Sequence, residues 1–119
     1  LIEDDGGSMA DLDKLMSLPG AMAAFEYSDK GELVSSKIAD GADLNDQVLN
    51  MLSHVCVANI SIATMQARGW EGLTGMSGFY PIGGFTLMGV DWSAVARGSQ
   101  GVVLKNSDAD YQAAYDALA

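Results

Sequence analysis

Few side chains in this sequence could act as catalysts, and their spacing separates them. His54 is the only histidine and Cys56 the only cysteine among 119 residues. Two positions apart on a predicted helix, they point to opposite sides and cannot share a metal ion or a proton. A Ser-His-Asp triad would have to use His54. We interpret His54 as a hydrogen-bonded packing residue or a pH-sensitive interface residue, and Cys56 as an inert buried thiol.

Carboxylates gather in three short groups, each where a helix is expected to begin. Carboxylates at such positions cap backbone N–H groups. An Asp-x-Asp pair alone lacks the loop that completes an oxygen-ligand metal site. We therefore predict no metal, no cofactor and no catalytic set, and we expect a protein that is not an enzyme. The groups are Asp11 and Asp13, then Asp40, Asp43 and Asp46, then Asp108 and Asp110.

Residues 69–84 are rich in glycine and carry several large apolar side chains. The segment has no Gly-Lys-Ser/Thr ending and precedes a strand, so it lacks the helix terminus that binds phosphate. We expect a flexible loop or irregular edge strand, or else a mobile binding loop. The candidate binding residues are Trp70, Met76, Phe79, Tyr80 and Trp92.

Charge is unevenly distributed along the chain. The net charge is −10, yet residues 47–90 carry only Arg68 and Glu71. Six scattered basic residues cannot form the basic patch that nucleic acid or an anionic membrane requires, so we expect neither partner. The uncharged run 47–67 is long enough to span a bilayer, but polar residues such as Asn50, His54 and Gln66 argue against a membrane span.

The length predicts one domain that needs no disulfide or metal to be stable. Residues 1–8 lack the basic start and apolar run of a signal peptide. We expect them to be an added segment or a disordered leader, with a single domain over 9–119. One cysteine and no signal peptide fit a cytoplasmic location.

A long helix is expected over residues 44–68, with Asp43 as its N-cap and Gly69 just past its end. It carries two apolar stripes. The less regular stripe comprises Leu49, Leu52, Cys56, Ile60, Ala63 and Ala67. The regular stripe, our candidate face for a second subunit or partner, comprises Leu44, Val48, Met51, Val55, Ala58, Ile62 and Met65.

Two stripes without charge indicate burial on two sides, because a helix on the surface of a monomer needs only one. A sheet can cover one side, and we expect a second subunit on the other. The competing interpretation is a central helix wrapped by its own chain. The spacing leaves open which stripe faces the sheet.

The remaining pattern predicts short strands and two terminal helices. A helix over 10–18 ends at Pro19-Gly20, and a last helix follows Asn106-Ser107, with Ser107 as its cap. Tyr111, Tyr115 and Leu118 should form its buried stripe. Tight turns between the strands indicate an antiparallel five-stranded sheet and an α+β fold. The expected strands are 21–28, 32–38, 85–88, 93–97 and 101–105.

Several short motifs resemble the roadblock / dynein light-chain superfamily, in particular a short stand-alone bacterial branch. They are Leu-Met-Ser-Leu-Pro-Gly at 15–20, Tyr-Ser-Asp-Lys-Gly-Glu-Leu-Val at 27–34, Cys-Val-Ala-Asn at 56–59 and Gly-Ser-Gln-Gly-Val-Val-Leu at 98–104. The resemblance implies a five-stranded antiparallel sheet, with the long helix on one face and the terminal helices on the other. It also implies homodimers that pair their long helices and join their sheets at the third strand.

Roadblock proteins are non-enzymatic platforms, and several bind or regulate small GTPases. Our first hypothesis is therefore a non-enzymatic homodimeric scaffold or regulatory module, with a small GTPase as a possible protein partner. The alternative is a small-ligand sensor with a pocket near residues 69–84.

Overall fold

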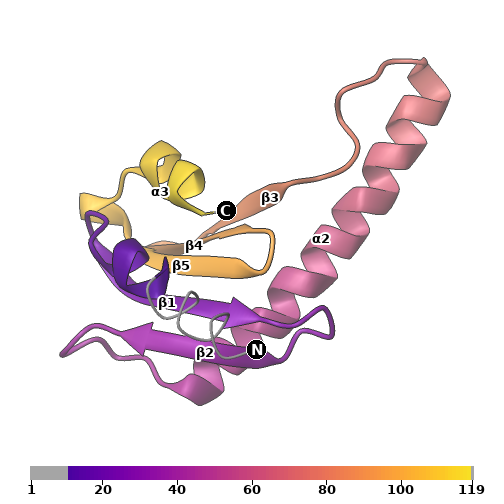
Figure 1. The fold of residues 1–119 in the computed structure, drawn as a ribbon. Coiled ribbons are helices and arrows are strands. Elements are labelled where there is room, and N and C mark those ends of the chain that lie inside the picture. Colours follow the sequence, from indigo (N-terminus) through magenta and orange to yellow (C-terminus); the bar gives the residue numbers. More distant parts are fainter. Residues whose placement is uncertain (1–10, 119) are drawn as a thin grey trace.

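A five-stranded antiparallel sheet with the strand order β2-β1-β5-β4-β3 forms the centre of the computed structural model, which describes residues 11–118 (Figure 1). The first and last strands pair at its centre. Every strand lies within about one residue of its expected range, so the predicted sheet is confirmed. The strands are β1 (Ala21–Tyr27), β2 (Leu33–Ile38), β3 (Gly84–Met88), β4 (Trp92–Arg97) and β5 (Gln100–Lys105).

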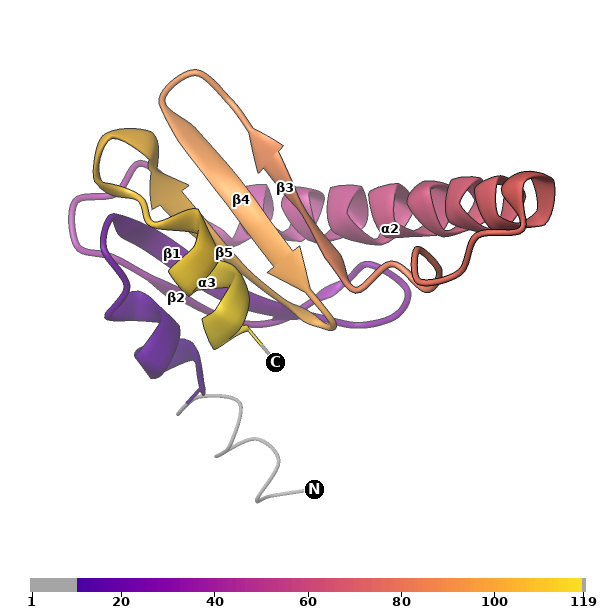
Figure 2. The ribbon, with the colours of Figure 1, turned by 90° about the horizontal axis from the view of Figure 1, so that it is seen from above.

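Helices cover both faces of the sheet. The long helix α2 (Asp46–Thr74) lies on one face, and the short helix α3 (Tyr111–Ala117) lies on the other with the helical segment 11–16 (Figures 1 and 2). This is the predicted arrangement. The expected added segment 1–8 and the beginning of the first helix lie outside the described residues.

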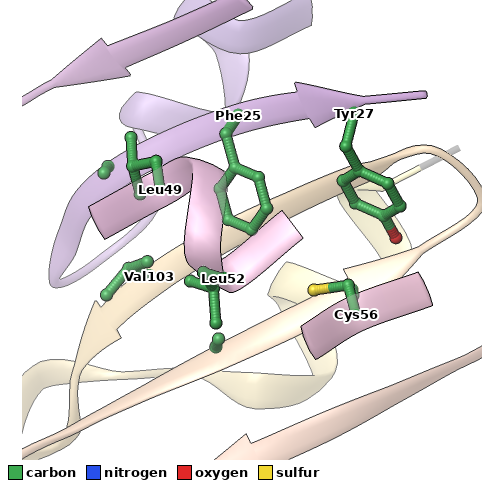
Figure 3. Close-up of a cluster of buried hydrophobic side chains, with 9 residues drawn as sticks. Phe25, Tyr27, Leu49, Leu52, Cys56 and Val103 are labelled. Carbon is green, nitrogen blue, oxygen red and sulfur yellow. The ribbon is translucent and has the colours of Figure 1, made fainter. Parts of the chain in front are cut away.

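The core beneath α2 follows from the alternation of strand side chains. Phe25 and Tyr27 point toward α2, whereas Ala24 between them packs on the opposite face. Leu52 and Cys56 descend from the helix onto these rings (Figure 3). Gly101 leaves room for Phe25, because a Cβ there would collide with its ring.

The second core joins the terminal helices to the opposite face. Leu12 and Leu15 from the first helix meet Leu118 near the end of the chain, and all three are fully or almost fully buried. Arg97 holds α3 in place, since its Nη1 donates to the carbonyl oxygens of Tyr115 and Leu118 at 3.1 and 3.2 Å. Its guanidinium also lies 4.6 Å from the centre of the Tyr115 ring.

The bounds predicted for the long helix were wrong at both ends. Asn45, not Asp43, is the N-cap, because its side chain accepts a hydrogen bond from the Val48 amide at 2.9 Å. The helix continues through Gly69 to Thr74 and ends at Gly75, whose φ of 72° suits a left-handed cap. The first third of the expected Gly-rich loop is therefore helical.

The start of the last helix also differs from the expectation. Asp110 is its N-cap, since its side chain accepts from the Ala113 amide at 3.0 Å. Ser107 lies in a 3₁₀ turn over Asn106–Asp108 instead. Asp110, one of the two carboxylates expected near the start of this helix, is thus the cap itself. Tyr111 and Tyr115 are half-buried and Leu118 is fully buried, as expected.

The second half of α2 extends beyond the sheet (Figure 1). By length and composition alone, this helix could cross a membrane. In the structure its first half packs on the sheet through Leu49, Leu52 and Cys56. The second half is accompanied by the chain that returns from Gly75 to β3.

Candidate functional site

The outer face of α2 carries a line of apolar side chains that no part of the described chain covers. The less regular stripe packs on the sheet, with Leu49 and Cys56 fully buried and Leu52 nearly so. The regular stripe therefore faces outward. We call its exposed members the outer stripe: Val48, Met51, Ala58, Ile62 and Met65.

Two of the seven residues predicted for the partner face, Leu44 and Val55, are not part of the outer stripe. Leu44 precedes the helix, and it packs with the half-buried Val55 against the core beneath α2. The others are accessible: the exposed fraction is 65% for Met51 and 73% for Met65. The outer stripe thus offers flexible thioethers and branched chains to a partner along several helical turns.

Glu71 ties the end of α2 to the chain that follows it. Its Oε2 accepts hydrogen bonds from the backbone amides of Phe79 and Tyr80, at 2.7 and 2.8 Å. These bonds favour the charged carboxylate, and the Tyr80 amide followed by the Phe79 amide lowers the pKa of Glu71 from its usual value. One exposed carboxylate therefore fixes the path of the loop.

Arg68 makes a second tie one helical turn earlier. Its Nη2 donates to the Tyr80 hydroxyl oxygen at 2.6 Å, and its guanidinium lies 4.7 Å from the centre of that ring. Arg68 and Glu71 are the only charged residues between positions 47 and 90. Both are used to hold residues 68–80, which we call the tip.

The tip presents large apolar groups around a shallow hollow. Trp70, Met76 and Phe79 line this hollow, which has a volume of about 490 Å³. Leu73 is beside them on the helix and is 86% exposed. Tyr80 does not line the hollow, because it is held against Arg68.

Trp92, the fifth predicted binding residue, is not part of the tip. It begins β4 and lines a different cavity of about 540 Å³ at the other end of the molecule. That cavity lies between residues 41–43, just before α2, and residues 90–92 of the β3–β4 hairpin. We call these two segments the end surface. Val90 within it is 95% exposed.

His54 and Cys56, the two side chains considered as candidate catalytic residues, make a backbone contact and a packing contact, respectively. His54 is exposed, and its Nδ1 lies 2.8 Å from the carbonyl oxygen of Asn50. Cys56 is buried beside Tyr27, and burial raises the pKa of its thiol to about 11. Within residues 11–118, no group of three His, Cys, Asp or Glu side chains is placed to hold a metal ion.

The sequence showed Arg68 and Glu71 as isolated charges but did not predict their partners. Periodicity places them on a helix or a loop and says nothing about a return of the chain eight or nine residues later. Their isolation within an apolar stretch was the available signal. A charged residue in such surroundings often has a specific partner.

One family model covers nearly all of the chain. Residues 11–119 match the family described as "Uncharacterized conserved protein (DUF2173)". The chain belongs to this family. A search of curated protein sequences finds no match.

Solved structures share the fold at low sequence identity. The gliding protein MglB from Thermus thermophilus has a TM-score of 0.70 and 16% identity, over 93% of this chain and 84% of that one. A structure described as MglB with a tetrameric arrangement has a TM-score of 0.69 and 15% identity, over 93% and 78%. A Roadblock/LC7 domain from Streptomyces avermitilis has a TM-score of 0.63 and 11% identity, over 92% and 86%. The roadblock-like fold predicted from the motifs is confirmed.

Proposed function

We propose that this chain is a non-enzymatic scaffold or regulatory module that works as a homodimer paired through the outer stripe of α2. The observation that carries this proposal is the line of exposed apolar side chains on a helix whose other face is already buried. Contiguous apolar surface of this kind marks interaction sites on soluble proteins. The tetrameric arrangement named for one MglB structure supports self-association in this fold.

A non-enzymatic role is supported by the state of the two candidate chemical groups. The sole histidine lies against a backbone carbonyl oxygen, and the sole thiol is buried and protonated at neutral pH. Within residues 11–118, the titratable group beside Cys56 is the Tyr27 hydroxyl, whose pKa is raised by burial, so it does not act as a base at neutral pH.

Light scattering of the purified chain at micromolar concentration tests self-association. We expect a dimer for the wild type. Met51→Lys and Met65→Lys should each weaken the dimer at least tenfold, because both positions lie on the outer stripe and would bury an unpaired charge. Both are exposed in the single chain, so the variants should keep its thermal stability. Ser61→Lys, at an exposed position beside the stripe, is the control. A monomeric wild type would contradict the proposal.

We further propose that the homodimer offers its surface to a protein partner such as a small GTPase in the cytoplasm. The roadblock resemblance of the motifs and the shared fold support this step. The experiment is capture from a bacterial extract, followed by nucleotide-exchange and hydrolysis assays on each captured GTPase. A GTPase whose rate changes with the wild type, and not with Met51→Lys, is the expected result. Captured proteins without any GTPase would count against this partner.

The hollow on the tip favours the alternative function, a small-ligand sensor. Trp70 and Phe79 offer aromatic faces to a flat apolar molecule, and Met76 offers a polarisable thioether. A thermal-shift screen with neutral aromatic compounds tests it. A ligand at a hundredfold excess over its Kd should stabilise the chain by about 2.7 kcal/mol. Trp70→Ala should abolish that shift, and an absence of stabilising compounds would contradict this function.

A further inference from the structure

α2 extends much further past the outer stripe at its C-terminal end, where the tip begins, than at its N-terminal end. α2 has 29 residues, which span about 43 Å at 1.5 Å per residue. The exposed large side chains of the outer stripe run from Val48 to Met65, so their midpoint falls between Cys56 and Val57. Beyond Met65 the helix continues for more than two turns, whereas before Val48 only two helical residues remain.

This asymmetry gives each copy an overhang in a two-fold pair. If two α2 helices run antiparallel about the midpoint of the outer stripe, residue 67 lies opposite Asp46, the first helical residue of the second copy, and residues 68–74 lie beyond it. Residues 68–74 then extend about 10 Å past the first residue of the other helix. They reach the segment that precedes it, which belongs to the end surface.

The overhanging part is apolar and held in shape. Trp70, Leu73, Met76 and Phe79 are each at least half exposed. The hydrogen bonds of Arg68 and Glu71 fix the loop against the helix, so little conformational entropy is lost on docking. Arg68 and Glu71 already have hydrogen-bond partners within the tip, so burying the tip against another surface leaves neither charge without a partner.

The end surface contains a concavity whose lining combines apolar residues with the charged residues Asp43, Asp91 and Lys105. Its cavity of about 540 Å³ is bordered by Trp92 and by Val90, one of the most exposed side chains of the described chain. Figure 2 shows the β3–β4 turn at the end of the molecule where α2 begins, opposite to the tip. Each copy therefore has one protruding apolar group at one end of α2 and one hollow at the other.

We propose that, in the homodimer, the tip of each copy docks on the end surface of the other, so that each of these two sites is built by both copies. The proposal rests on the pairing of α2 helices proposed above. The occupant is a second copy of this chain, because a two-fold axis uses both tips and both hollows at once. A lipid surface would use the tips and leave the end surfaces empty.

Cysteine cross-linking in a Cys56→Ala background tests the docking. The key variant combines Leu73→Cys with Ala42→Cys, treated with a short bis-maleimide and read as dimer on a denaturing gel. Within one chain, Leu73 lies about 40 Å along α2 from Asp46, its first residue, and Ala42 precedes Asp46, so a short cross-link between positions 42 and 73 must join two copies. We expect efficient cross-linking. Leu73→Cys with Val34→Cys, an exposed residue on β2, is the control that should not react.

Ala58→Cys separates failure of the docking from failure of the homodimer. Ala58 lies beside the proposed axis, so this variant should cross-link to its own equivalent whenever α2 helices pair antiparallel. If Ala58→Cys reacts and the Leu73/Ala42 pair does not, the docking is overturned and the homodimer stands. Cross-linking of Leu73→Cys alone would show parallel helices and also overturn the docking. A monomer by light scattering would overturn both.

Leu73→Ala with Trp70→Ala provides a second measurement. Both side chains are exposed in the single chain, so the monomer should keep its melting temperature. We expect the dimer Kd to rise at least tenfold. An unchanged Kd would overturn the docking. Association of the wild type with vesicles of zwitterionic phosphatidylcholine, lost in this double variant while the Kd is unchanged, would assign the tip to lipid instead.

Discussion

At the scale of single residues, the carboxylate of Glu71 has the largest structural role among the polar groups of the charge-poor stretch 47–90. It accepts from two consecutive amides, and those amides belong to the loop that carries Phe79. A neutral amide in its place would be a weaker acceptor and could turn a donor toward the same N–H groups. The shape of the tip therefore depends on one ionised oxygen.

Glu71→Gln should loosen the tip. We expect faster hydrogen exchange at the amides of Phe79 and Tyr80, by several-fold, with unchanged exchange in β5. Glu32→Gln, at an exposed turn residue, is the matched control. If both amides exchanged as slowly in the variant as in the wild type, the carboxylate would not be holding the loop.

The same carboxylate gives the tip a pH dependence of known sign. The hydrogen bonds lower the pKa of Glu71, so its contribution is complete above the ordinary glutamate pKa of about 4.3 and is lost as pH falls through the lowered value. In NMR spectra the amide chemical shifts of Phe79 and Tyr80 should stay constant above the ordinary glutamate pKa and change together only at lower pH. Shifts centred at or above the ordinary value would contradict this.

Cys56 should be almost unreactive while the chain is folded. Burial raises its pKa to about 11, and the thiolate is the reactive form, so little of it exists at pH 8. Labelling with a maleimide at pH 8 should be at least a hundredfold slower in the native protein than in denaturant. Comparable rates would place the thiol at the surface.

At the scale of elements, two glycines that look alike in the sequence have opposite roles. Gly69 lies inside α2 with open space where a Cβ would be, so Gly69→Ala should stabilise the monomer by about 0.5–1 kcal/mol. Gly101→Ala would push a methyl group into the Phe25 ring and should cost about 1–3 kcal/mol. Urea unfolding of both variants measures the two effects, and effects of equal sign would contradict the described packing.

The elements were predictable where one local pattern dominates. The alternation of apolar and polar residues predicted the strands. The turn ending at Gly31, whose φ is 84°, predicted the first hairpin. The limits of α2 were not predictable, because Asn45 and Asp43 are both good caps. The interior cost of Gly69 and Gly72, about 1 kcal/mol each, is outweighed by contacts such as those of Glu71 that form only in the folded chain.

The site was predictable in part. The spacing of apolar residues predicted both stripes, but it could not decide which of them faces the sheet. Tertiary packing of Leu49 and Cys56 on Phe25 decides that. Trp92 was grouped with the tip because it is aromatic and lies near the Gly-rich stretch in sequence, whereas the β3–β4 hairpin carries it to the far end.

At the scale of the whole molecule, the charge distribution should control association. Two copies with a net charge of −10 each repel one another, and the stretch 47–67 brings no charge to the interface that could offset this. Raising the ionic strength from 0.01 M to 0.1 M shortens the screening length from about 30 Å to about 10 Å. We expect the dimer Kd to fall several-fold, as measured by analytical ultracentrifugation. A Kd that rises with salt would indicate ion pairs across the interface.

The order of strands also bears on how the chain is made. β1 emerges from the ribosome before β2, α2, β3 and β4, yet its inner neighbour β5 begins only at Gln100 and is made after all of them. Until then α2 and the β1–β2 hairpin have only half a sheet to pack on, and both cores lack Val102, Val103 and Leu104. The apolar side chains that pack against β5 therefore stay exposed until residues 100–105 are translated, which makes this small domain a candidate client for chaperones that bind nascent chains.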